Sequence, residues 1–226
     1  MHVVLPVITA LSCGVSFWLM LRDFDNQKEA AIQAGEENAG TAVFPKSAMV
    51  YSAVCVLITV LISAFFTYMF PNNSPWVNVK RMILLSILWP IAYIDFKTLR
   101  IPNLFVVYGL ICRAVILVFE VFLENTQVWG GLISEVIAAG ALLLASILCA
   151  LAVKNGIGFG DMKLFLVMGL MLGLEGIWGA IFLALIVSFF IAIYVLLTKK
   201  KTRKDAIPFG PALVIGAYLS ICLSGM

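Results

Sequence analysis

Long apolar runs separated by short polar stretches make up almost the whole chain. A membrane-spanning helix needs about 20 consecutive, mostly apolar residues, and runs that approach or reach this length recur along the sequence. We therefore predict an all-α protein, a polytopic transmembrane helical bundle of about eight spans in a lipid bilayer. The predicted spans are residues 3–21, 48–70, 82–96, 102–123, 130–153, 161–174, 176–198 and 207–225.

The composition favours a membrane protein over a soluble one. Of the 226 residues, 63% are hydrophobic and 12% are charged, whereas soluble domains carry about 45–50% apolar and about 25% charged residues. The five cysteines lie singly, no C-x-x-C pair is present, and His2 is the only histidine. We therefore expect no metal site, no cofactor and no histidine-based catalytic relay.

The charges of the loops predict how the bundle is oriented. The longest basic run, residues 199–204, follows the seventh span and should be cytoplasmic. Counting back through the spans places three further loops on that side: residues 22–47, 97–101 and 154–160. Twelve lysines and arginines then lie on the cytoplasmic side, against two, Lys80 and Arg81, on the other. We predict a multi-pass protein of the cytoplasmic membrane with its N-terminus and C-terminus outside.

Two aspartates lie at the ends of membrane-length apolar segments. Asp95 ends the third predicted span, and Asp161 opens the sixth, after three alternating glycines. A charge at membrane depth costs about 3 kcal/mol on insertion scales, which makes both residues functional candidates. Two carboxylates also suffice for acid–base hydrolysis without a metal or a nucleophile.

Each aspartate also has a structural interpretation. Asp95 could pair with Lys97 or Arg100 at the membrane surface. Asp161 could be a first-turn or N-cap acid that stabilises its helix. Taken singly, neither residue decides between the two interpretations.

A third unusual element is Ile207-Pro208-Phe209-Gly210-Pro211-Ala212-Leu213, which directly follows the basic loop. Two prolines and a glycine at the start of a span oppose a regular helical entry. The element is then either a kinked helix start or a segment that exposes backbone groups beside an active site and holds a substrate strand.

Together these elements resemble the prepilin peptidases, the type IV leader peptidases among the G-x-G-D aspartic proteases of membranes. The resemblance rests on Asp95 with Ile101-Pro102-Asn103, Gly158-Phe159-Gly160-Asp161 with Lys163, and Ile207-Pro208-Phe209-Gly210-Pro211. It covers roughly residues 80–226, a six-span peptidase core, and leaves residues 1–79 as two N-terminal spans. Residues 22–47 contain no cysteine, so the chain is more similar to compact members than to those with a cysteine-rich methyltransferase segment.

The resemblance implies an enzyme that removes the short basic leader from prepilin-like precursors, which carry a hydrophobic helix. Asp95 and Asp161 would be catalytic, activating a water molecule without a cofactor. No nucleic acid partner is implied. Residues expected to contact the substrate are Gly158, Phe159, Gly160, Lys163, Pro208, Phe209, Gly210 and Pro211.

Two other functions fit part of the pattern. An intramembrane protease of the presenilin or signal-peptide-peptidase type shares similar motifs, but it has an adjacent Tyr-Asp where this chain inserts Ile94 between Tyr93 and Asp95. A proton-coupled transporter also uses intramembrane carboxylates. Such transporters often show internal repeats, and we see none here.

Further charged residues complete the sequence-based predictions. Residues 22–47 are expected to form a solvated short helix or loop, whose acidic surplus could attract a basic leader or simply face solvent. Arg113 and Glu135, each inside an apolar run, are predicted to pair within the bundle in a structural role.

Overall fold

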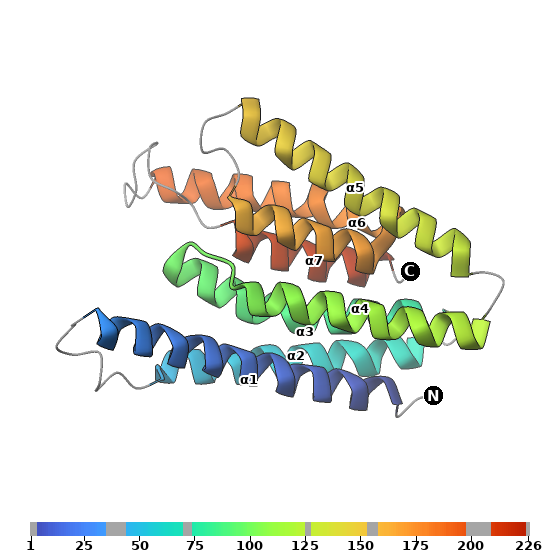
Figure 1. The fold of residues 1–226 in the computed structure, drawn as a ribbon, viewed down its shortest axis with the longest axis horizontal. Helices are drawn as coiled ribbons and strands as arrows, with labels where there is room; N and C mark the ends of the chain where they lie inside the picture. The colour runs from blue at the N-terminus through green and yellow to red at the C-terminus, as the bar shows by residue number, and fades with distance from the viewer. Residues whose placement is uncertain are drawn as a thin grey trace.

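The computed structural model describes residues 4–34, 44–69, 74–124, 128–152, 158–197 and 209–224. Within these ranges the chain is helical and contains no strand, so the predicted all-α class is confirmed. Six helices are long and apolar enough to cross a membrane, and the last is a shorter apolar helix (Figure 1). The helices are α1 (Val4–Gln33), α2 (Lys46–Met69), α3 (Pro75–Thr98), α4 (Asn103–Glu124), α5 (Val128–Ala152), α6 (Phe159–Leu197) and α7 (Gly210–Ser224).

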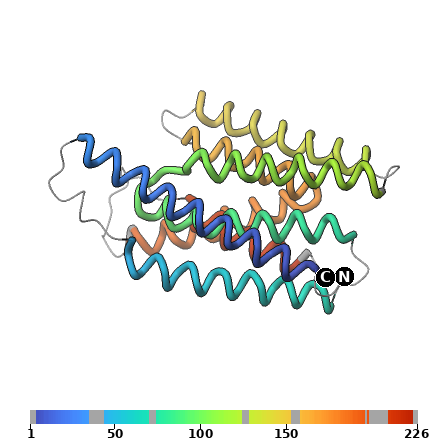
Figure 2. Tube along the Cα trace, turned by 60° about the horizontal axis from the view of Figure 1, so that its bottom comes forward, coloured from blue at the N-terminus to red at the C-terminus, as the bar shows by residue number. Residues whose placement is uncertain are grey.

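Helix α6 consists of two segments that meet at Gly173. This residue has φ 64° and ψ −175°, a conformation that is readily accessible only to glycine. The chain reverses there, so that the two segments lie side by side (Figures 1 and 2). Counting them separately gives the eight apolar segments in the predicted order. At about 1.5 Å per residue, Phe159–Gly173 is only about 22 Å long, shorter than a hydrocarbon core of about 30 Å.

The boundaries of two helices differ from the prediction. Helix α1 continues to Gln33, beyond the predicted end of the first span at residue 21. Residues 22–33 are thus helical, one of the two forms predicted for this segment, because a polar sequence can extend a helix beyond the bilayer. Helix α3 begins at Pro75 rather than at residue 82. Both ends of the described chain lie at the same end of the bundle (Figures 1 and 2), as an even number of apolar segments requires.

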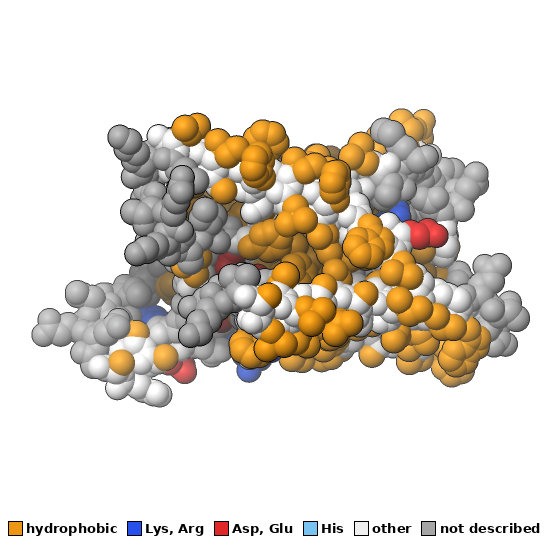
Figure 3. Space-filling view, turned by 90° about the horizontal axis from the view of Figure 1, so that it is seen from above, with side chains coloured by type: hydrophobic (Ala, Val, Ile, Leu, Met, Phe, Trp, Pro, Cys, Tyr) orange, Lys and Arg blue, Asp and Glu red, His pale blue; other side chains and the backbone are white. Residues whose placement is uncertain are grey.

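Helix α3 forms the centre of the bundle. It packs against α1, α2, α4, α6 and α7. Of its apolar 18-residue stretch, 83% is buried, against 39% or less for the corresponding stretch of the other long helices. The outer helices expose large apolar side chains, and Figure 3 shows hydrophobic side chains covering the middle of one face with few charged ones among them. Lipid tails are the natural environment for such a surface. The central helix is the one that ends in Asp95.

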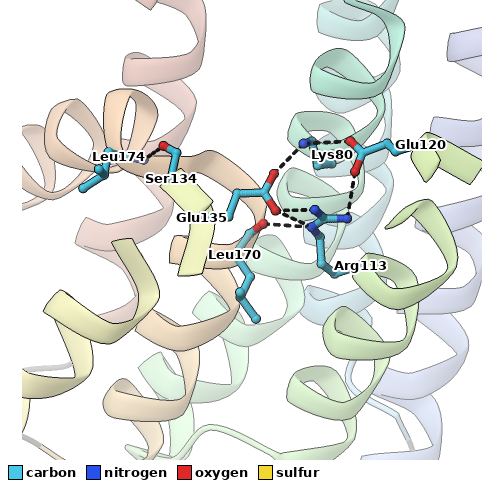
Figure 4. Close-up of polar contacts among 7 residues, drawn as sticks. All are labelled: Lys80, Arg113, Glu120, Ser134, Glu135, Leu170 and Leu174. Carbon is cyan, nitrogen blue, oxygen red and sulfur yellow. Dashed lines mark hydrogen bonds and ion pairs between the residues drawn. The ribbon is translucent and has the colours of Figure 1, made fainter. Parts of the chain in front are cut away.

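Four buried charges join α3, α4 and α5 in a network, which confirms the predicted pair of Arg113 and Glu135 (Figure 4). Lys80 Nζ lies 2.5 Å from Glu135 Oε1 and 2.9 Å from Glu120 Oε1. The guanidinium of Arg113 also lies 3.0 Å from Glu120 and donates to the Leu170 carbonyl at 3.1 Å. Lys80 is therefore inside the bundle, and its expected place in an outer loop was wrong.

Candidate active site

Asp95 is buried, with 6% of its surface exposed, at the C-terminal end of α3. The backbone N–H of Gly210 donates to its Oδ2 atom at 2.7 Å, and Gly210 is the first residue of α7. A Cβ atom at position 210 would lie 2.8 Å from Oδ2 and 2.9 Å from the Cβ of Asp95. Only glycine can therefore occupy position 210 without moving the carboxylate.

Asp161 lies in the first turn of α6 and is half-buried. Gly158 and Gly160 allow two close approaches beside it. A Cβ atom at Gly158 would lie 3.3 Å from Asp161 Oδ2, and one at Gly160 would lie 3.0 Å from the Cβ of Ile101. Gly158 thus brings the backbone next to the Asp161 carboxylate, and Gly160 brings it next to Ile101, in the connection between α3 and α4.

The two carboxylates meet at one cavity of about 240 Å³. Asp161 lies close enough to Asp95 for their charges to interact. The cavity opens at the end of the bundle where α3 ends and α6 begins. Its lining residues are Asp95, Leu99, Arg100, Ile101, Asn103, Gly158, Phe159, Gly160, Asp161 and Lys163.

Of the eight residues that were expected to contact a substrate, five lie at the site of the two aspartates. Four of them, Gly158, Phe159, Gly160 and Lys163, line the cavity itself, and Gly210 contacts Asp95 directly.

The remaining three candidates lie elsewhere. Phe209 packs edge-on against Phe165, with ring centroids 6.1 Å apart. Pro211 lines a separate, mostly apolar groove of about 510 Å³ between α2, α3 and α7. Pro208 lies outside the described residues.

Sequence reasoning missed the role of the segment that connects α3 to α4. This segment, residues 99–103, is called the strap below, and four of its residues line the cavity. Asn103 Oδ1 accepts a hydrogen bond from Lys163 Nζ at 2.9 Å. Arg100, which the structural interpretation of Asp95 offered beside Lys97 as a possible partner, forms an ion pair at 3.0 Å with Asp23 of α1. The short spacing between Asp95 and the Ile-Pro-Asn motif was the available signal that the strap belongs to the site.

Comparison with known proteins identifies one family and several curated relatives that the chain matches. The model of the type IV leader peptidase family matches residues 82–197, just over half of the chain. A prepilin leader peptidase/N-methyltransferase of Bacillus subtilis (strain 168) is 29% identical over 62% of this chain and 53% of its own length. One from Aeromonas hydrophila is 25% identical over 65% of this chain and 50% of its own. The chain thus spans about half the length of the curated relatives it matches, and no solved structure matches it.

Proposed function

Because the chain belongs to the type IV leader peptidase family, we propose that it is a membrane aspartic endopeptidase that removes the short basic leader from prepilin-like precursors. The observation that carries the proposal is the cavity that Asp95 and Asp161 line together. The names of the curated relatives support the substrate class. The proposal covers cleavage alone, since residues 22–47 contain no cysteine of the kind found in the methyltransferase segment.

In the proposed mechanism the two carboxylates share one proton. The ionised aspartate takes a proton from a water molecule, and the protonated one donates a hydrogen bond to the scissile carbonyl oxygen. Water attacks the carbonyl carbon, and the departing amine then receives a proton from the pair. The N–H of Gly210 points at Asp95, and such a donor favours a charged acceptor.

The site is proposed to face the cytoplasm. Lys97, Arg100 and Lys163 lie beside the two aspartates at one end of the bundle. In the sequence the basic run 199–204 directly precedes the α7 end that contacts Asp95. Positive charge accumulates on the cytoplasmic side of membrane proteins, so a precursor's basic leader would reach the cavity from that side.

The decisive experiment uses membrane vesicles that contain this chain and a purified prepilin-like precursor added from outside. Inverted vesicles, which expose the cytoplasmic face, should remove the leader, whereas right-side-out vesicles should not. Mass spectrometry of the product should place the cut between the basic leader and the hydrophobic helix. Vesicles that lack the chain are the control. A lack of cleavage in both orientations contradicts the proposed activity, and cleavage by right-side-out vesicles alone contradicts the proposed sidedness.

Replacing Gly210 with alanine is expected to lower the cleavage rate about 100-fold. The new methyl group would displace the Asp95 carboxylate, and a misplacement of about 1 Å in a catalytic group can cost about 10²-fold. Gly14→Ala in α1 is the matched control, because an added Cβ there meets nothing within 4 Å. The measurement is the initial rate of leader removal at saturating precursor. Equal rates for the two variants would contradict a close fit between Gly210 and Asp95.

A further inference from the structure

The strap contacts both aspartate-bearing helices. At its start, Leu99 donates its N–H to the backbone carbonyl of Asp95 at 2.9 Å. In its middle, Ile101 packs closely against Gly160, next to Asp161. At its end, Asn103 binds Lys163, two residues beyond Asp161. The position of the strap therefore bears on the spacing of the two carboxylates.

The strap begins with a residue whose backbone conformation is intrinsically unfavourable. Leu99 adopts the left-handed conformation, with φ 52° and ψ 39°. It is the only residue other than glycine with a positive φ in the described part of the chain. A side chain disfavours this region because its Cβ approaches the backbone. Such a conformation persists where surrounding contacts impose it.

Asp23 supplies a contact of this kind from a different helix. Its carboxylate accepts two hydrogen bonds from Arg100 Nη2, at 3.1 and 3.0 Å, and one from Gln27 Nε2 at 2.5 Å. The Asp23 side chain is 9% exposed, whereas that of Arg100 is 47% exposed. Asp23 does not line the cavity that contains Asp95 and Asp161. Its hydrogen bonds to the strap are the two that it accepts from Arg100.

We infer that Asp23 is a positioning residue of the active site, which anchors the strap through Arg100 and so fixes the spacing of Asp95 and Asp161. This inference rests on the proposed peptidase function. It also distinguishes Asp23 from the other acids of residues 22–47. Its charge is already paired with Arg100, whereas Asp25, two residues later on the same helix, is exposed.

The kinetic test compares Asp23→Asn with the matched change Asp25→Asn. Loss of the anchor should lower kcat about tenfold and leave KM within about twofold, because misplaced catalytic groups slow the chemical step. Asp25→Asn should retain the wild-type kcat. If Asp23 instead attracted the basic leader, its loss would raise KM at constant kcat, and that result would overturn the inference.

A double variant tests whether Asp23 acts through Arg100. Arg100→Gln should lower kcat as Asp23→Asn does, and the double variant should be no slower than the slower single variant, because the two residues form one contact. Single effects that multiply in the double variant would mean that the two residues act separately, and would overturn the inference.

Hydrogen exchange provides a readout that does not depend on activity. In the full-length protein in nanodiscs, Asp23→Asn should accelerate amide exchange in the strap several-fold and leave the middle of α3 unchanged. If amide exchange in the strap were unchanged, the inference that Asp23 anchors the strap would be wrong, even if kcat falls. If the wild-type chain cleaves no precursor, the proposed function fails, whereas the exchange experiment still decides whether Asp23 holds the strap.

Discussion

Replacing either Asp95 or Asp161 with asparagine is expected to abolish removal of the leader by this chain. An amide can neither take a proton from water nor give one to the scissile carbonyl, so each single change removes one half of the proposed acid–base pair. General acid–base groups contribute about 10² to 10⁴ each. Because the two carboxylates at this cavity are proposed to share one proton, we expect each variant to fall by about 10³-fold or more.

Both asparagine variants should fold and insert normally. Asparagine has nearly the same volume as aspartate, and its side-chain oxygen at position 95 can still accept the N–H of Gly210. The pair with its shared proton carries one negative charge, and each variant leaves a single carboxyl group, so neither variant adds buried charge to the site. The amounts of protein in the membrane and the elution profiles in detergent should match the wild type. Asp25→Asn, the same change at an exposed position, is the control and should retain full activity.

The measurement is cleavage of a co-expressed precursor, followed by gel mobility and by mass of the product. Normal processing in either aspartate variant would contradict the two-carboxylate mechanism. The position of the cut tests the alternative to a leader peptidase. Cleavage within the hydrophobic helix, rather than before it, would favour a presenilin-like intramembrane protease.

The sequence predicted most of the fold because lipid-exposed helices leave a continuous apolar signal. The turn at Gly173 was visible as a short break between two apolar runs, and the structure contains a chain reversal there. The pair of Arg113 and Glu135 was predictable for the opposite reason, since each is a charge inside an apolar run and requires a partner. Local pattern is sufficient where the environment of a residue is set by the bilayer.

The sequence failed where a charge is buried by residues distant in the chain. Lys80 looked like the end of a loop, but Glu120 and Glu135 neutralise it inside the bundle, so α3 begins earlier than predicted. Asp23 looked like part of a solvated loop, yet its partner Arg100 lies 77 positions away. The pattern indicates that a charge needs a partner only where the charge interrupts an apolar run, as at Arg113 and Glu135; Lys80 and Asp23 lie beside the ends of such runs, so their own neighbours in the sequence do not indicate burial.

Removing Arg113 alone from the buried network is expected to destabilise the protein strongly. In Arg113→Met, two carboxylates remain buried with one lysine, and breaking a buried ion pair in this way costs about 3–5 kcal/mol. The Leu170 carbonyl, near the break at Gly173, also loses its donor. The free energy of unfolding can be measured by titrating SDS into mixed micelles. Arg81→Met is the matched control, because Arg81, the next residue after Lys80 in α3, has no ion pair among the described residues.

A double variant separates the cost of an unpaired charge from the value of the network itself. Arg113→Met with Glu135→Leu leaves Lys80 paired with Glu120 at 2.9 Å, so the buried charge is balanced again. We expect it to regain more than half of the lost stability, because replacing a complete buried pair by apolar residues is often neutral. Lys80 is 15 positions before Asp95 in α3, about 22 Å along the helix, so the folded fraction of either variant should cleave at the wild-type rate. A double variant as unstable as the single one would mean that Arg113 acts mainly by holding the Leu170 carbonyl beside the turn of α6.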